Sequence, residues 1–280
     1  MVIRIAHSPD SDDAFMFYAL TSGKVDTEGL EIQHVLADIE TLNREALKGT
    51  YEVSAISFHA YPYVADKYLV LPSGGSVGEG YGPLVVSKED LSTLKGKRIA
   101  VPGKLTTAYL VLKLYQPEFE EVIMPFDTIL EAVEKGSVDA GLIIHEGQLS
   151  YADKNLKKVV DLGEWWKEER GLPLPLGCNV IRKDLGWDLI KKMERLMRKS
   201  IKYALENKEA ALEFAKNYAR DIKEDKARIE KFVGMYVNER TLDYGEDGRQ
   251  AVKLLLQLGI ERGIIKADMP HTIFSDEVVI

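Results

Sequence analysis

Cysteine is nearly absent from this 280-residue sequence, which contains a single copy, Cys178. One cysteine excludes a disulfide within the chain, and it offers no pair of thiolates for a zinc or redox site. Nothing near Cys178 marks an activated thiol, so we expect it to be structural. The motifs HExxH, CxxC and GxxxxGK[ST] are missing too. Their absence removes support for common zinc, redox and P-loop functions.

Long hydrophobic runs and an excess of positive charge are also missing. No apolar run approaches the roughly 20 residues that span a bilayer, and the opening MVIRIAHSPD lacks the pattern of an export signal. The net charge is −8 and the pI is about 5.3, whereas nucleic acid binding depends on basic patches. We therefore expect a cytoplasmic protein that neither inserts into a membrane nor binds nucleic acid.

The sequence does contain a regular alternation of strand and helix patterns. Apolar segments at 2–6, 30–36 and 53–57 predict strands, and helices are predicted between them, the first capped by Asp12 or Asp13. The pattern restarts after about residue 90, and residues 187–263 read as amphipathic, charged helices without strands. This order predicts an α/β protein with helices covering parallel sheets. We expect two lobes with a cleft between them, a larger one formed by residues 1–86 and 182–280, and a smaller one formed by residues 87–181.

A short internal similarity supports two related lobes. The segments ALKGTYEVSAISFH and AVEKGSVDAGLIIHE both read as a helix end, a glycine, an acidic residue and an apolar strand. Ligands of parallel sheets bind beyond the carboxyl ends of the strands. Two facing lobes would therefore bring Ser57 and His145, which follow such strands, into one cleft. His7 and His59 lie near other strand ends, but helix capping or a buried hydrogen-bonded role fits them better.

Two turns between a strand and a helix are candidate ligand sites. In VPGKLTTAYLVLKLY, Thr106 or Thr107 starts an apolar helix, and its first backbone amides suit a carboxylate or phosphate. Both hydroxyls could cap the helix or meet a ligand, although most capped helices bind nothing. In SPDSDDAF, Ser8, Asp10 and Ser11 are weaker candidates, because this turn lacks a glycine-rich phosphate cradle.

Several segments together resemble a known family. VPGKLTTAYLVLKLY, AGLIIHEGQLSY and VVDLGEWWKEERGLPLPLG, in this order, resemble the 1,4-dihydroxy-6-naphthoate synthases of the futalosine route to menaquinone. IAHSPDSDDAFMFYAL and DIETLNREALKGTYEVSAISFHAY resemble the same family, and the likeness covers about the first 185 residues closely. A common family version of the first turn reads Ser-Pro-Cys-Pro-Asn-Asp. Here Asp10, Ser11 and Asp12 replace its Cys-Pro-Asn, which leaves a role of this turn in ligand contact open.

This resemblance implies a fold, a reaction and a set of site residues. The fold is like that of type II periplasmic binding proteins, with two lobes, two crossovers and a central cleft. The reaction is a carbon–carbon cleavage of cyclic dehypoxanthine futalosine to 1,4-dihydroxy-6-naphthoate and dihydroxyacetone, without a metal or organic cofactor. The residue matching His145 is the family's proposed proton acceptor. The residues implied to contact this small carboxylate substrate are Ala55, Ile56, Ser57, Thr107 and Ala108.

The mechanism that we expect is general-base catalysis. His145 would remove a proton from the sugar-derived ring, and a retro-aldol cleavage would follow. Two other functions fit the same fold. A chorismate dehydratase of the same pathway would act on a different carboxylate, and a solute-binding protein would bind a small anion without chemistry. The histidine of LIIHE favours the synthase, and the lack of an export signal disfavours the solute-binding protein.

Overall fold

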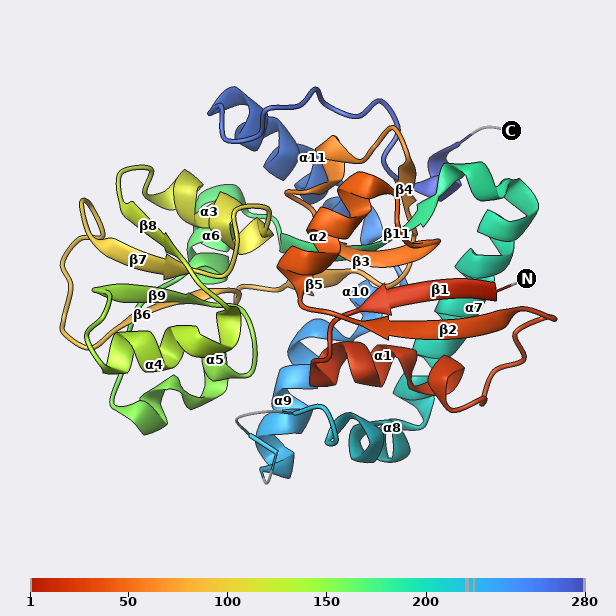
Figure 1. Ribbon diagram of the computed structural model, residues 1–280, viewed down its shortest axis with the longest axis horizontal. Coiled ribbons are helices and arrows are strands. Elements are labelled where there is room, and N and C mark those ends of the chain that lie inside the picture. The colour runs from red at the N-terminus through yellow and green to blue at the C-terminus, as the bar shows by residue number, and fades with distance from the viewer. Residues whose placement is uncertain (1, 220–221, 224, 279–280) are drawn as a thin grey trace.

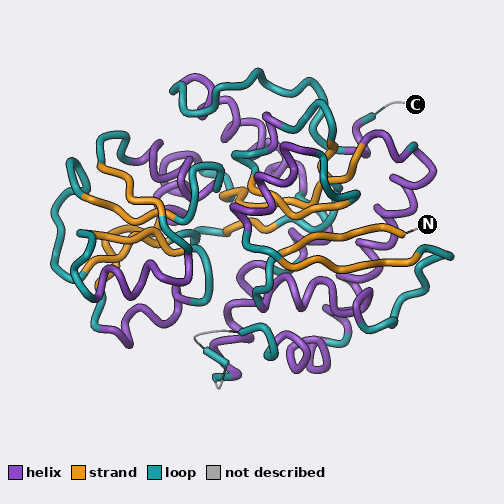
Figure 2. The backbone as a smooth tube through the Cα atoms, in the orientation of Figure 1, coloured by secondary structure: helices purple, strands orange, loops and turns teal. Residues whose placement is uncertain are grey.

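Two β-sheets, each with its own helices, form the protein (Figure 1). The computed structural model describes residues 2–219, 222–223 and 225–278. Figure 2 shows the strands of the two sheets lying next to each other, with the helices wrapped around them. Within those ranges, none of the helices has the length and apolar character that a membrane crossing requires. The predicted two-lobed α/β architecture is confirmed.

The first lobe holds a six-stranded sheet in the order β2-β1-β3-β11-β4, with β5 paired to β11. Its strands are β1 (Val2–His7), β2 (Glu31–Leu36), β3 (Val53–Ser57), β4 (Tyr68–Val70), β5 (Ser76–Gly78) and β11 (Leu174–Arg182). Strand β1 runs parallel to β2 and β3, but β11 runs antiparallel to its partners. The expectation of a purely parallel sheet is therefore wrong here, because β11 enters this sheet on the chain's return from the second lobe.

The second lobe holds a five-stranded sheet in the order β10-β6-β9-β7-β8. Its strands are β6 (Leu84–Ser87), β7 (Arg98–Val101), β8 (Glu120–Ile123), β9 (Ala140–Ile143) and β10 (Lys157–Asp161). Strand β7 is parallel to β8 and β9, whereas β6 is antiparallel to β9 and β10. The helices of this lobe are α3 (Thr107–Tyr115), α4 (Ile129–Glu134) and α5 (Gly147–Ser150), and α6 (Leu162–Arg170) follows β10 on the way back to the first sheet.

The chain crosses between the two sheets twice. It leaves the first sheet after β5 and returns to it after β10 and α6. The boundaries expected from the sequence, after residues 86 and 181, fall inside β6 and β11. We propose 79–83 and 162–173 as the crossovers, because a strand belongs to the lobe whose sheet it hydrogen-bonds with.

Helices account for the rest of the first lobe. These are α1 (Ser11–Thr21), α2 (Ile39–Lys48), α7 (Trp187–Glu206), α8 (Lys208–Ala215), α9 (Lys226–Tyr236), α10 (Glu239–Leu242) and α11 (Gly245–Glu261). The predicted strand-free run from residue 187 is confirmed for its described residues. Helix α1 packs against α7, α8 and α9, and Phe15, Met16 and Phe17 are all buried. Because other helices cover α1 on several sides, its apolar residues after Asp13 do not form a single apolar stripe.

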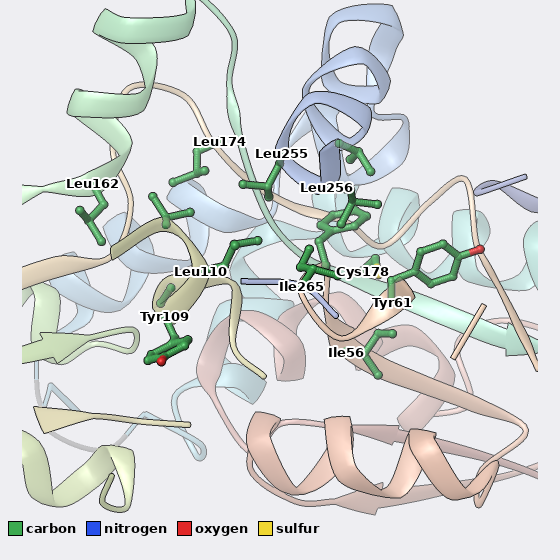
Figure 3. Close-up of a cluster of buried hydrophobic side chains, with 14 of the residues drawn as sticks. Ile56, Tyr61, Tyr109, Leu110, Leu162, Leu174, Cys178, Leu255, Leu256 and Ile265 are labelled. Atoms are coloured by element: carbon green, nitrogen blue, oxygen red, sulfur yellow. The ribbon is translucent and has the colours of Figure 1, made fainter. Parts of the chain in front are cut away.

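The largest hydrophobic core joins the two lobes at the crossovers. Figure 3 shows part of this core, with Leu110 of α3, Leu162 of α6, Leu174 and Cys178 of β11, and Leu255 and Leu256 of α11. Cys178 is 2% exposed, and burial raises the pKa of its thiol well above the ordinary value. Both observations support the structural role that we predicted for this cysteine.

Candidate active site

A cleft lies between the lobes. One wall comes from the ends of β1 and β3 and from β11, and the other from the start of α3 and from the segment after β9. The structure brings eight of the ten predicted site residues to this cleft, namely Ser8, Asp10, Ala55, Ile56, Ser57, Thr106, Thr107 and Ala108.

Ser57, at the end of β3, is held by a buried asparagine of α2. The Ser57 amide donates to Asn43 Oδ1 at 2.8 Å, and Asn43 Nδ2 donates to Ser57 Oγ at 3.1 Å. Because Oγ accepts this bond, its own proton remains available for a ligand in the cleft. Asn43 is fully buried. The sequence analysis did not identify Asn43, because a single asparagine inside a helix forms no recognisable motif. Its position on the apolar, buried face of α2 is the feature that could have identified it.

Replacing Asn43 with alanine is expected to weaken substrate binding about tenfold, with a smaller change in kcat. The Ser57 amide and hydroxyl lose their partner, and a lost buried hydrogen bond costs about 1–3 kcal/mol. Steady-state kinetics would measure this as a raised KM. Ser57→Ala should show a similar defect, and the double variant should be little worse than either single one. Asn217→Ala, in the exposed turn after α8, is the control; an unchanged KM for Asn43→Ala would contradict the assignment.

The start of α3 presents backbone amides to the cleft. The Thr106 hydroxyl accepts from the Tyr109 amide at 3.2 Å and donates to the Gly103 carbonyl, which confirms Thr106 as the helix cap. The Thr107 hydroxyl donates to the Leu176 carbonyl at 2.6 Å and accepts from the His59 amide at 3.2 Å. Both hydroxyls thus donate one hydrogen bond and accept one within the protein, and each keeps a second acceptor lone pair. The first amides of the helix have no intrahelical partners and suit an anion.

Two predicted residues, Ser11 and His145, do not line the cleft. His145 Nδ1 accepts from the Gly147 amide at 3.0 Å, and its Nε2 lies 3.3 Å from the Phe126 carbonyl oxygen. The ring also meets the Phe126 ring edge-on at 5.1 Å. Its neighbours Ile144 and Gln148 do line the cleft. The chain leaves β9 at Ile143 and turns into α5, so the alternation of side chains along a strand no longer sets the direction of His145.

Four carboxyl groups gather on the cleft side of α1. Helix α1 begins at Ser11, so Asp12 and Asp13 lie in its first turn and do not cap it, contrary to our prediction. Asp13 Oδ2 instead accepts from the Ser8 amide at 2.7 Å, and Asp10 Oδ2 accepts from the Ser8 hydroxyl at 2.9 Å. Glu146 joins them from the other lobe. Its Oε1 accepts from the Ser11 hydroxyl at 2.7 Å.

The surroundings of these carboxyl groups favour protonation. Burial raises the pKa of Asp12 well above its ordinary value, and the nearby charges of Asp13, Asp10 and Glu146 raise it further. Burial also raises the pKa of Asp13 to about 6. The pKa of Glu146 is raised first by burial and then by the charge of Asp10. Carboxyl groups this close titrate together, and the cluster retains a proton at pH values at which isolated carboxyl groups are ionised.

Replacing Asp12 with asparagine is expected to raise the unfolding temperature by a few degrees near pH 7. The folded-state pKa of Asp12 exceeds the unfolded value near 3.8. The folded protein therefore binds this proton more tightly, and stability falls as the pH rises from about 4 towards the raised pKa. Asparagine does not ionise, so the variant does not lose stability in this way as the pH rises. Thermal unfolding at pH 4 and pH 7 should show a gain at pH 7 that shrinks at pH 4; an equal gain at both would point to packing.

The remaining histidines of interest take structural roles, as predicted. His7 Nδ1 lies 3.0 Å from the Ser8 carbonyl oxygen, and its Nε2 lies 3.1 Å from His34 Nδ1. His59 Nδ1 lies 3.1 Å from the Thr106 carbonyl oxygen. Both are buried outside the cleft lining.

The structure also reveals a polar bridge between the lobes, in which the Tyr236 hydroxyl donates to Gln148 Oε1 at 2.6 Å.

Comparison with known proteins places this chain in a family. A family described as menaquinone biosynthesis matches residues 3–261. The chain belongs to the menaquinone-biosynthesis family. A relative from Thermus thermophilus, named 1,4-dihydroxy-6-naphthoate synthase, is 44% identical over 272 residues, covering 97% of this chain and 98% of the relative. A relative of the same name from Streptomyces coelicolor is 37% identical over 97% of each chain. The resemblance to these synthases is thus confirmed, and the protein is an enzyme, not a solute-binding protein.

Solved structures confirm the fold expected of this family member. A protein of known structure from Archaeoglobus fulgidus is 54% identical, with a TM-score of 0.91 over 94% of this chain and 98% of its own. A Candida albicans protein described as having the generic periplasmic-binding-protein fold matches with a TM-score of 0.66 at 13% identity, over 96% of this chain and 97% of its own. The second likeness shows the fold alone. It confirms the periplasmic-binding-protein-like fold predicted from the sequence.

Proposed function

We propose that this member of the family cleaves cyclic dehypoxanthine futalosine to 1,4-dihydroxy-6-naphthoate and dihydroxyacetone. The observation that carries the proposal is the near full-length likeness to two synthases named for this product. The cleft supports it, because Ala55, Ile56, Ser57, Thr107 and Ala108, the residues that the resemblance implies in substrate contact, line one cavity.

The two walls of the cleft offer complementary groups to such a substrate. The first amides of α3 would bind the carboxylate, since helix amino termini favour negative charge. From the opposite wall, the Ser57 hydroxyl would donate to a substrate oxygen, oriented for this by Asn43. The apolar lining, which includes Ile56 and Leu176, would hold the aromatic ring system. Closure of the lobes around it would exclude water.

His145 is proposed as the general base, after a turn of its ring. In the neutral ring that accepts from the Gly147 amide, the proton sits on Nε2, which faces the Phe126 carbonyl oxygen at 3.3 Å. The unprotonated nitrogen, Nδ1, therefore already accepts a hydrogen bond from the Gly147 amide and is not available to a substrate proton in this orientation. Because Ile144 and Gln148 already line the cleft, release of these two contacts would bring the ring towards the substrate. We propose that substrate binding drives this turn.

Incubation of the purified protein with cyclic dehypoxanthine futalosine, followed by mass spectrometry, tests the function. The expected products are 1,4-dihydroxy-6-naphthoate and dihydroxyacetone, formed with equal yield in a chelator. A parallel incubation with chorismate tests the sister activity. Turnover of chorismate alone would replace the proposed substrate, and binding without turnover of either compound would contradict the proposed reaction.

A further inference from the structure

Asn179 of β11 is a buried polar residue on the first-lobe wall of the cleft. Its exposed fraction is 1%. Strand β11 pairs antiparallel with β3, so that Asn179 lies opposite Ala55 and Gly177 lies opposite Ser57. Paired residues share a face of a sheet, and side chains alternate along each strand. These four residues therefore lie on one face, and all four line the cleft.

The turn before β5 fixes the direction of the Asn179 amide. Its Nδ2 donates to the Gly74 carbonyl at 2.8 Å, and the Gly74 amide donates to the Thr241 carbonyl at 2.7 Å. A flipped amide would place two acceptor oxygens against each other at Gly74. The nitrogen of the side chain therefore faces the turn, and Oδ1 is directed away from Gly74.

This oriented oxygen has no donor within the protein. Asn179 Oδ1 is buried, and it has no hydrogen-bond partner among the residues that the structure describes. Buried polar groups are nearly always paired, because an unpaired acceptor is unfavourable. Met16 Sδ, 3.7 Å from Nδ2, belongs to a cleft-lining side chain that is flexible enough to move for a ligand. An amide oxygen only accepts, so it fits a ligand hydroxyl and not an ionised carboxylate.

Asn179 also lies some way along β11 from the anion-binding start of α3. The Thr107 hydroxyl donates to the Leu176 carbonyl, and Leu176 precedes Asn179 by three residues. At about 3.4 Å per residue, this is about 10 Å of strand. A two-ring ligand whose carboxylate meets the first amides of α3 would therefore extend its far end towards Asn179. In the proposed substrate, that far end is the sugar-derived part, which carries hydroxyl groups.

We propose that Asn179 is a specificity-determining residue whose Oδ1 accepts a hydrogen bond from a hydroxyl of the sugar-derived part, within the fragment released as dihydroxyacetone. This role rests on the proposed function. Ser57, on the same face, donates to a substrate oxygen while Asn179 accepts from one. An analogue without the hydroxyl leaves Oδ1 buried and unpaired, and sites of this kind reject such analogues strongly.

Kinetics of the Asn179→Ala variant test this contact. We expect KM to rise about tenfold or more, with a smaller change in kcat. Substrate analogues that each lack one sugar-derived hydroxyl complete the test as competitive inhibitors. One analogue should bind the wild type about tenfold more weakly than the others do, yet have the same inhibition constant for the variant. The variant lacks only the contact that this analogue cannot make, so the two losses are not additive.

Binding of 1,4-dihydroxy-6-naphthoate separates the contact from general damage to the cleft. This product lacks the released fragment, so calorimetric titration should give the same dissociation constant for Asn179→Ala and the wild type. Ser54→Ala is the matched control and should leave KM unchanged. Ser54 is a fully buried polar residue on the opposite face of β3, outside the cleft lining.

Several outcomes would overturn the role of Asn179 in an enzyme that acts on the substrate. These are an unchanged KM in Asn179→Ala, an equal loss of substrate and product binding, and analogues that all lose the same affinity between the wild type and the variant. If the variant does not fold, equal inhibition constants of all the analogues for the wild type would overturn it. A wild type that does not turn over the substrate would overturn the proposed function and this role with it.

Discussion

Replacing His145 with asparagine is expected to lower kcat by about 10²–10⁴-fold, the range that general-base catalysis supplies. Asparagine is the most informative replacement, because His145 is 3% exposed and its Nδ1 accepts a hydrogen bond from the Gly147 amide. The asparagine Oδ1 reaches a similar position and keeps that bond. It cannot take up a proton near neutral pH, so the variant removes the base and retains the structural contact.

His145→Ala is the companion variant, and it separates the two roles of the ring. Alanine leaves the Gly147 amide without its acceptor and opens a cavity beside Phe126, so a stability loss of about 2–4 kcal/mol is expected as well. That cavity also makes rescue by added imidazole possible. Restoration of turnover by imidazole in the alanine variant would support the base. Near-normal kcat in a folded His145→Asn variant would remove His145 from the chemistry.

Much of the fold was predictable because it depends on repeating local patterns. The alternation of apolar segments and helices indicated two α/β lobes, and the charged amphipathic repeats indicated the helical run that begins at α7. The direction of β11 was not predictable in this way. A nine-residue apolar strand reads the same whether it joins its sheet parallel or antiparallel, and its direction follows from where the chain re-enters the first lobe.

The candidate site shows the same division between local and long-range causes. Ser57 and Ala108 were found because strand and helix ends are local features, and the structure places both at the cleft. The meeting of Glu146 with Ser11 joins residues from different lobes. It depends on how the lobes close, so a single sequence carries no local signal for it. The orientation of His145 depends likewise on Phe126, which lies on another segment of the chain.

Gly163→Ala is expected to reduce both stability and turnover, because the two crossovers touch at this glycine. A Cβ atom at Gly163 would lie 2.0 Å from the carbonyl carbon and oxygen of Tyr81 and 2.5 Å from the Gly82 nitrogen. These are backbone atoms of the first crossover, and they are fixed nearby by the hydrogen bond from the Leu162 amide to the Pro83 carbonyl at 3.0 Å. Backbone cannot rotate away as a side chain can, so the crossovers must move apart.

The separation caused by Gly163→Ala should displace one wall of the cleft against the other. Overpacking costs about 1–3 kcal/mol, and we expect the upper end of that range in the free energy of unfolding. Misplacement of reacting groups by about 1 Å lowers turnover about 10²-fold, so kcat should fall even where the variant remains folded.

Gly234→Ala in α9 is the control, because nothing lies within 4 Å of its Cβ position. Alanine there should stabilise the helix by about 1 kcal/mol without affecting kcat. Wild-type stability and turnover in Gly163→Ala would mean that the crossovers do not set the geometry of the cleft.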